Sequence, residues 1–219
     1  MHTGDKAIIT GDSKTLITGD FKTMTVAFVI PCKVSDTGTM SIMVGRKKTG
    51  LGVGKLTLFG GKVEVNESPQ QAMIRELAEE AFVKPKDAQK LGRLVMEIQD
   101  IRLRLIAHIF RCSDVIGQPT ESYEMTVEWV PVSDIPYDQM WADNKYWMPY
   151  LLSGQSFEGE FVFADIDTLI KHTCGPRTPR SLSTIVASAY TTPTVSYASI
   201  VSSNTVTVGN KSPTPLKLD

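Results

Sequence analysis

The most constraining feature of this chain is the segment 60–80, where a glycine pair is followed by a helical pattern that carries three clustered carboxylates. Ser68 and Pro69 predict the start of the helix, because serine is a favoured N-cap and proline fits the first helical position. Gln71 stands three residues after Ser68 and completes a capping box. Pro85 bounds the helix at its far end.

The three glutamates of this helix, Glu76, Glu79 and Glu80, share one arc of its surface. At roughly 100° per residue they adjoin an apolar arc that contains Met73 and Leu77, so that the apolar arc can pack on a sheet while the carboxylates face a cleft. Three like charges at this spacing destabilise a bare helix. Mg²⁺ or Mn²⁺, which prefer carboxylate and carbonyl oxygens, would remove that cost. Taken alone, the string is more typical of a solvated acidic helix face, and its context decides between the two interpretations.

Apolar runs and turn signals elsewhere predict strands first, with helices inserted among them. This order indicates an α+β fold, an α/β/α sandwich with a mixed β-sheet. The predicted elements are a hairpin over 25–45, strands over 56–59, 91–98, 103–111 and 128–132, and helices over 144–152 and 163–172.

The chain divides into one predicted domain and two predicted tails. Residues 24–173 form the domain, and residues 1–23, in which Thr-Gly-Asp recurs three times, are predicted to be a flexible leader. The Ser/Thr/Pro-rich residues 174–219 are predicted to be mainly disordered. Within them, the β-branched stretch 194–208 allows a strand as the alternative.

Charge and cysteine content narrow the class of partner and the compartment. A net charge of −1 gives no basic field for a nucleic-acid polymer or an anionic membrane, and no apolar stretch is long enough to span a bilayer. Three widely spaced cysteines argue for a reducing compartment. Because no secretory signal or transit peptide is visible, we expect a monomer in the cytoplasm that acts on a small molecule, with the nucleus and mitochondrial matrix as alternatives.

The context of the carboxylates resembles the Nudix family, whose box reads G-x5-E-x7-R-E-U-x-E-E-x-G-U with U aliphatic. Only Phe82 departs, because it stands where the family has the glycine that ends the helix. Eight positions match: Gly61, Glu67, Arg75, Glu76, Leu77, Glu79, Glu80 and Val83.

The resemblance implies Mg²⁺-dependent hydrolysis of a nucleoside diphosphate linked to another group. It implies that Glu76, Glu79 and Glu80 are metal ligands beside the carbonyl of Gly60. Glu79 or Glu80 would also position or deprotonate water. Glu67 and Arg75 would form a supporting ion pair, and the alternative for them is a surface pair of little energetic value.

From Met24 to about Lys171 the chain further resembles the oxidised-purine nucleoside triphosphatase branch of that family, the 8-oxo-dGTP diphosphatases. The stretches that carry the resemblance are Gly45–Lys48, Phe59–Val63, Glu121–Met125 and Met140–Trp147.

This branch implies that Trp141 stacks on the base, Asp143 reads its edge and Lys47 meets phosphate. Glu124 would be a further metal ligand or a carboxylate that orients water. The alternatives are a core tryptophan, a solvated lysine and an ordinary loop carboxylate. The substrate-binding residues implied are Lys47, Leu51, Thr57, Phe59, Gly61, Met96, Ile98, Trp141, Asp143 and Asn144.

Several departures from the branch predict a purine-sized pocket with an altered base preference. Thr57 stands where the branch has an asparagine, and Asn144 replaces the second of two adjacent aspartates. An Asp143/Asn144 pair keeps one acceptor and gains a fixed amide donor. The pocket walls are expected to be aliphatic rather than aromatic, because Leu51, Met96 and Ile98 replace phenylalanines.

The leading hypothesis is therefore nucleotide-pool sanitation, in which an oxidised purine nucleoside triphosphate gives the monophosphate and pyrophosphate. One alternative keeps the chemistry on a nucleotide sugar, a dinucleoside polyphosphate or capped RNA. Another is a nucleotide-binding module without turnover. The intact glutamates and the match around Trp141 favour the first hypothesis.

Overall fold

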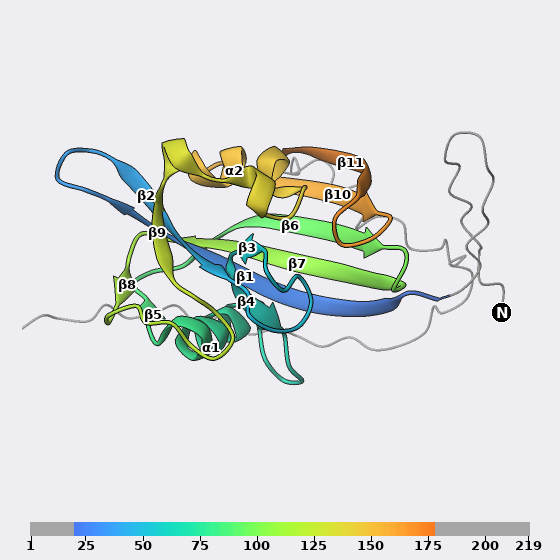
Figure 1. The fold of residues 1–219 in the computed structure, drawn as a ribbon, viewed down its shortest axis with the longest axis horizontal. Helices are drawn as coiled ribbons and strands as arrows, with labels where there is room; N and C mark the ends of the chain where they lie inside the picture. The colour runs from blue at the N-terminus through green and yellow to red at the C-terminus, as the bar shows by residue number, and fades with distance from the viewer. Residues whose placement is uncertain (1–19, 178–219) are drawn as a thin grey trace, which may run out of the picture. The chain divides into compact units, whose positions relative to one another are not determined.

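The computed structural model describes residues 20–177, in which nine strands form one large sheet with a helix on each side and two short strands, β5 (Lys84–Pro85) and β8 (Val115–Ile116), pair separately (Figure 1). The predicted leader and tail lie outside the described residues, except for 20–23 and 174–177. The strands are β1 (Lys22–Val34), β2 (Met40–Arg46), β3 (Leu56–Thr57), β4 (Phe59–Lys62), β5 (Lys84–Pro85), β6 (Gln89–Ile98), β7 (Leu103–Cys112), β8 (Val115–Ile116), β9 (Glu128–Pro131), β10 (Phe157–Phe163) and β11 (Leu169–Pro176). The α-helices are α1 (Pro69–Ala81) and α2 (Asn144–Leu152), and the 3-10 turns are η1 (Val132–Asp134) and η2 (Tyr137–Gln139).

The sheet is mixed, as predicted, in the order β11-β10-β6-β7-β1-β2-β3, with β4 pairing β1 and β9 pairing β2. β1 pairs with β7 in parallel and β10 with β6 in parallel, whereas the other pairs are antiparallel. The long strand β1 divides one edge between two partners. Its middle pairs with β4 and its end pairs with β2, which forms the predicted hairpin.

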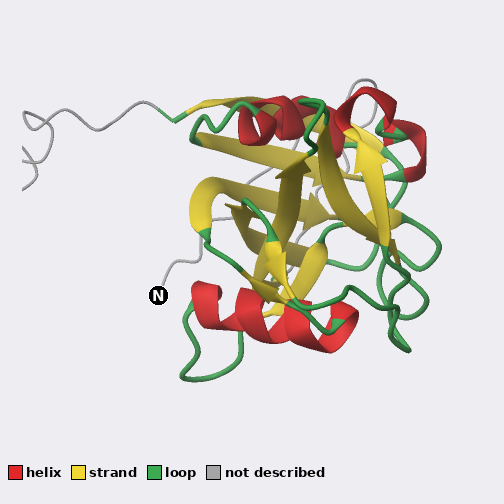
Figure 2. Cartoon of the chain, turned by 90° about the vertical axis from the view of Figure 1, so that its left-hand side faces the viewer, coloured by secondary structure: helices red, strands yellow, loops and turns green. Residues whose placement is uncertain are grey.

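The two helices cover opposite faces of the sheet (Figure 2). Helix α1 packs on β1 and β4 through the buried side chains of Met73 and Leu77. Helix α2 packs on β10 and β11, where Trp147, Met148 and Leu151 are buried. The predicted α/β/α sandwich is therefore confirmed, and the carboxylate arc of α1 lies beside the strands it packs on.

Helix α1 begins and ends as its sequence indicates. Ser68 Oγ accepts the backbone N–H of Gln71, and the Gln71 side chain accepts the backbone N–H of Ser68, over 3.3 and 2.8 Å. At the other end Phe82 takes the left-handed conformation, with φ 58°, and its N–H bonds the carbonyl of Ala78. The helix thus stops where the family has glycine, although a phenylalanine must adopt the left-handed backbone.

Two predicted elements differ in the structure. The helix predicted over 163–172 is wrong, because β10 ends at Phe163 and the edge strand β11 follows a turn. Asp165 Oδ1 accepts the backbone N–H groups of Asp167 and Thr168, which fixes that turn in place of a helix. The strand predicted over 56–59 is split at Leu58 into β3, which pairs with β2, and β4, which pairs with β1.

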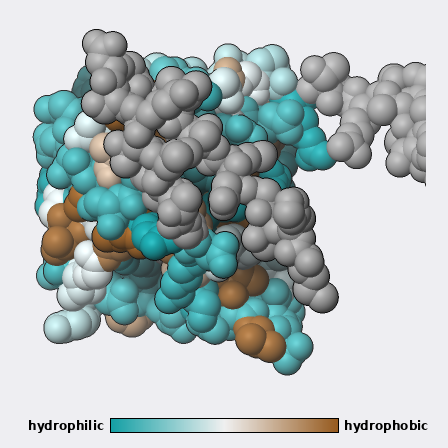
Figure 3. Space-filling view, turned by 90° about the vertical axis from the view of Figure 1, so that its right-hand side faces the viewer, coloured by the Kyte–Doolittle hydropathy of each residue, from teal (hydrophilic) through white to brown (hydrophobic). Residues whose placement is uncertain are grey.

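Within residues 20–177 no helix has both the length and the apolar content needed to cross a membrane. On the face shown in Figure 3, hydrophilic residues predominate between separate hydrophobic spots.

Candidate active site

Glu80 is the buried carboxylate of the α1 arc, with 2% of its surface exposed. Its Oε2 accepts the backbone N–H of Gly60 over 2.8 Å, and its Oε1 lies 3.5 Å from Lys47 Nζ. Burial raises the pKa of Glu80 to about 7, although the Gly60 N–H and the Lys47 ammonium both act to lower it. A carboxyl that titrates near neutrality can exchange a proton at physiological pH.

Glu76 is half-buried where helix α1 meets β4, and burial raises its pKa against the lowering effect of Arg75. Gly61 allows this approach, because a Cβ at this position would lie only 2.5 Å from Glu76 Oε1. The glycine of the box is therefore required by contact with a carboxylate.

Arg75 holds the helix to the preceding loop. Its Nε and Nη2 donate to the two oxygens of Glu67, each over 2.9 Å, in a bidentate pair. Its Nη1 donates to Glu76 over 2.7 Å and to Glu79 over 3.2 Å, and Nη2 also donates to the Lys62 carbonyl. The geometry of the predicted ion pair is thus present, and it reaches two further glutamates.

The carboxylates of the α1 arc are of the chemical type that a divalent cation prefers. Glu79 is exposed, whereas Glu76 and Glu80 are more buried. The carboxylate oxygens, which are hard donors, therefore extend along the arc from the protein interior to the solvent. Exposed Glu124 also lies near Lys47, with its Oε2 3.9 Å from the ammonium. In the described residues no three histidine, cysteine or acidic side chains are gathered closely enough to hold an ion. Arg75 pairs with Glu76, and Lys47 pairs with Glu80.

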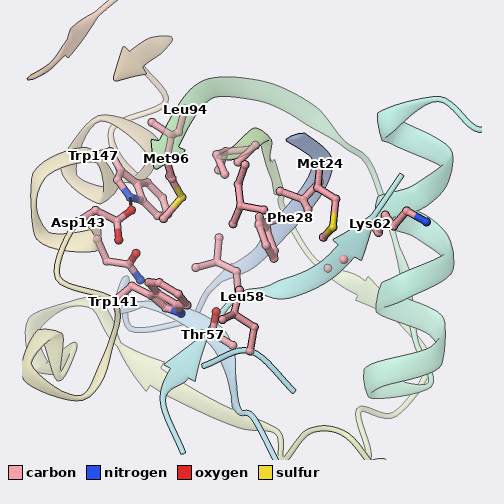
Figure 4. A pocket seen from close by; sticks show the side chains of 18 of the residues that line it. Met24, Phe28, Thr57, Leu58, Lys62, Leu94, Met96, Trp141, Asp143 and Trp147 are labelled. Atoms are coloured by element: carbon pink, nitrogen blue, oxygen red, sulfur yellow. Dashed lines mark hydrogen bonds between the residues drawn. The ribbon is translucent and has the colours of Figure 1, made fainter. Parts of the chain in front are cut away.

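A cavity of about 270 Å³ lies beside these residues. Lys47, Gly60 and Gly61, which contact Glu80 or Glu76, line it together with Trp141 and Asp143. Figure 4 shows the cavity from close by, with Asp143 and Trp141 across it from Lys62, the neighbour of Gly61. The remaining lining residues are Met24, Val26, Phe28, Leu51, Thr57, Leu58, Lys62, Leu94, Met96, Leu105, Ala107, Ile109, Asn144 and Trp147.

Asp143 and Asn144 place two unpaired polar atoms at the far end of the cavity. Asp143 is 1% exposed, and its Oδ2 accepts the indole Nε1–H of Trp147 over 2.7 Å (Figure 4). Asp143 Oδ1 and Asn144 Nδ2 have no hydrogen-bond partner among residues 20–177. Burial raises the pKa of Asp143 to about 6, against the lowering effect of the Trp147 bond. This end offers one acceptor and one donor to a ligand, because buried polar groups are rarely left unpaired.

Trp141 forms a wall beside this pair. Its ring packs edge-to-face on Phe163, with centroids 5.8 Å apart. Gly52 approaches the indole so closely that a Cβ there would lie 3.1 Å from the ring. Contacts with β10 and with the 50–54 loop therefore fix the orientation of the ring.

The structure brings most of the predicted substrate-binding residues to the cavity, but not two of them. Phe59 and Ile98 are fully buried and do not line it. Phe59 packs in the core beneath α1, and Ile98 is paired with Phe163 in the core on the other face. The expectation of aliphatic walls is also corrected, since Phe28 and Trp147 contribute aromatic rings.

The residues that sequence reasoning missed have a common signal. Met24, Val26 and Phe28 alternate along β1, and side chains two apart in a strand share one face. All three line the cavity. Trp147 belongs to the stretch Met140–Trp147 that resembles the oxidised-purine branch. Its hydrogen bond to Asp143 forms because one turn of helix α2 brings the two side chains together.

Comparisons with known proteins agree with this geometry. The model of the NUDIX domain matches residues 24–151, more than half of the 219-residue chain. An oxidized purine nucleoside triphosphate hydrolase of Danio rerio is 38% identical over 131 residues, which cover 60% of this chain and 84% of that relative. The protein of the same name from Mus musculus is 37% identical over the same shares. Among solved structures, a mutator MutT protein of Bacillus halodurans shares the fold with a TM-score of 0.61, at 21% identity over 71% of this chain and 99% of its own.

Proposed function

The chain belongs to the NUDIX family of hydrolases, and on that basis we propose that it hydrolyses oxidised purine nucleoside triphosphates such as 8-oxo-dGTP to the monophosphate and pyrophosphate. One observation carries the proposal. The same cavity has an unpaired acceptor, Asp143 Oδ1, and an unpaired donor, Asn144 Nδ2, at one end, and the glycine pair beside Glu76 and Glu80 at the other. A nucleotide has a base edge and a phosphate chain at its two ends, in the same order.

NUDIX hydrolases generally need divalent cations, and we assign Mg²⁺ to this site, with Mn²⁺ as a substitute. Glu76, Glu79 and Glu80 would hold the ion, with the Gly60 carbonyl and Glu124 nearby. When bound, it would neutralise phosphate charge and lower the pKa of the attacking water.

The chain's own side chains supply orientation and proton transfer. Lys47, which is 22% exposed beside Glu80, is available to a phosphate oxygen once the substrate binds. Glu80 or the exposed Glu79 accepts the proton of water. Arg75 fixes the helix against the loop that carries Glu67, so that the carboxylates keep their places during turnover.

The base preference differs from that of the oxidised-purine branch. Asn144 gives a fixed amide donor beside the Asp143 acceptor, so the pair recognises a purine edge with a neighbouring acceptor and donor. Thr57 lines the cavity with a short hydroxyl at the position where the branch has an asparagine. The physiological role that follows is removal of damaged nucleotides from the precursor pool, by a monomer in the cytoplasm.

Variants of Glu79 and Glu80 test the assignment. Glu79→Gln and Glu80→Gln should each abolish turnover of 8-oxo-dGTP in Mg²⁺ while the circular dichroism spectrum and nucleotide binding persist. Glu158→Gln, at an exposed glutamate of β10 that does not line the cavity, is the matched control and should retain full activity. Undiminished turnover by both variants would refute the assigned metal site.

A further inference from the structure

The β2–β3 loop, residues 47–55, contacts both the carboxylate arc and Trp141. Lys47, at the start of the loop, pairs with Glu80. Gly52, in its middle, approaches the Trp141 ring so closely that a Cβ there would lie 3.1 Å away. Glycine loses more conformational freedom on folding than any other residue, so a loop that turns at glycines keeps one shape only where other groups anchor it. Three glycines of this loop have a positive φ of 74° to 85°: Gly50, Gly52 and Gly54.

Lys55, the last residue of the β2–β3 loop, anchors it to the turn between β10 and β11. The Lys55 Nζ lies 2.5 Å from Oδ1 of Asp167, which belongs to that turn. The Lys55 side chain is only 18% exposed, although Asp167 is 70% exposed. Asp165 holds the turn itself, because its Oδ1 accepts the backbone N–H groups of Asp167 and Thr168. The glycine-containing loop is thus tied to a turn that hydrogen bonds fix.

The Trp141 ring contacts both sides of this connection. The Lys55 ammonium is 6.0 Å from the ring centroid, at the outer limit of a cation–π contact. Phe163, which ends β10 just before the turn, packs edge-to-face on the same ring. Thr57, two residues after Lys55, lines the cavity together with Trp141 (Figure 4). Lys55 therefore joins the loop, the turn and the aromatic wall of the cavity.

We propose that Lys55 is a positioning residue, whose ion pair with Asp167 latches the β2–β3 loop to the β10–β11 turn and so holds the Trp141 ring in place for stacking on the base. This inference rests on the proposed function, since it concerns how the base of that substrate is held. It gives a part in base binding to two charged residues that do not line the cavity.

Acrylamide quenching of tryptophan fluorescence tests the latch without any substrate. The chain has three tryptophans, and Trp147 is 2% exposed, so in a Trp129→Phe background the quenchable emission comes from Trp141. In that background Lys55→Met, which keeps the apolar stem and removes the charge, should raise the quenching constant. Lys55→Arg should leave it near that of the parent protein. Equal quenching in all three proteins would overturn the latch.

Steady-state kinetics with 8-oxo-dGTP and Mg²⁺ test the consequence for the substrate. Lys55→Met should raise KM by about two- to fivefold, the range that a partly exposed ion pair supplies, and leave kcat unchanged. Lys55→Arg should restore the wild-type KM. Lys171→Met is the matched control, because it removes the same charge from an exposed position of β11 that does not line the cavity. A KM for Lys55→Met no higher than that for Lys171→Met would overturn the proposal.

A double variant identifies the partner of Lys55. Asp167→Asn should raise KM by less than Lys55→Met does, because the ammonium also lies near Asp165. The pKa of Asp165 is lowered chiefly by the hydrogen bond from the Asp167 N–H and in part by Lys55. The double variant should have the KM of Lys55→Met alone, since loss of either partner breaks the same pair, and a KM raised by the product of the two single effects would overturn the assigned pair. If the wild-type chain does not turn over 8-oxo-dGTP, the proposed function fails, whereas the quenching measurement still decides the latch.

Discussion

The indole Nε1–H of Trp147 donates a hydrogen bond of 2.7 Å to Oδ2 of Asp143, and the other oxygen of that carboxyl remains unpaired among the described residues. The two residues are one turn apart at the start of helix α2, and both are buried. Trp147 is itself stacked on Phe157, with centroids 5.8 Å apart. The Asp143 carboxyl is thus oriented by a side chain that the core holds in place.

Trp147→Phe should weaken base recognition while the fold is retained, since phenylalanine keeps the stacking on Phe157 but cannot donate to Asp143. Loss of a hydrogen bond to a charged acceptor predicts about a tenfold fall in kcat/KM for 8-oxo-dGTP, seen mainly as a higher KM. Steady-state kinetics check this, with thermal unfolding as the measure of fold. An unchanged KM would show that Asp143 needs no orientation by Trp147.

Asp143→Asn should stabilise the free protein above pH 6. Burial raises the pKa of Asp143 from 3.8 to about 6, so the folded protein binds this proton more tightly than the unfolded chain does. The free energy of unfolding therefore falls as pH rises from about 4 to 6, by about 3 kcal/mol at most. Urea unfolding of both proteins at pH 4 and pH 7.5 should show the variant more stable at the higher pH and nearly equal at the lower. A variant that is less stable at pH 7.5 would contradict the cost of the buried charge.

Thr57→Asn and Asn144→Asp restore the residues of the oxidised-purine branch. We expect the double variant to raise the ratio of kcat/KM for 8-oxo-dGTP to kcat/KM for 2-hydroxy-dATP by about tenfold. The reason is that a changed hydrogen-bond donor in the pocket alters which purine edge finds partners for its own donors and acceptors. The measurement compares 8-oxo-dGTP, 2-hydroxy-dATP and dGTP for both proteins. A wild-type chain that already prefers 8-oxo-dGTP strongly, with no shift in the variant, would remove the case for altered selectivity.

Phe82→Gly should stabilise the protein by about 1 kcal/mol, because a residue with a Cβ is strained in the left-handed region and glycine is not. Phe82 has φ 58° and is 60% exposed, so its side chain loses little packing. Phe82→Ala is the control, since it removes the ring and keeps the Cβ. Thermal unfolding that ranks the glycine variant at or below the alanine variant would contradict the strain.

The sequence predicts those parts of the molecule that depend on local chemistry. Ser68, Pro69 and Gln71 define the start of helix α1, and the glutamates of its acidic arc follow from helical periodicity. The resemblance of the stretch Met140–Trp147 to the oxidised-purine branch also indicates Trp141, Asp143 and Asn144. These features need no knowledge of distant partners, and the structure contains each of them.

Other parts depend on contacts between distant strands, and there the sequence is insufficient. β11 has too little apolar alternation to identify it, and its pairing with β10 determines its conformation. Phe59 and Gly60 are neighbours, yet the first points into the α1 core while the second borders the cavity. Met24, Val26 and Phe28 line the cavity together with residues of β7, because β7 lies parallel beside β1.

The central claim is that the two ends of one cavity act on one nucleotide, and the products of 8-oxo-dGTP in the presence of Mg²⁺ test it most directly. Chromatographic separation of the reaction should give 8-oxo-dGMP and pyrophosphate in equal amounts, with no turnover when EDTA replaces the metal. Release of orthophosphate with the diphosphate, turnover that persists in EDTA, or no hydrolysis at all would contradict the account.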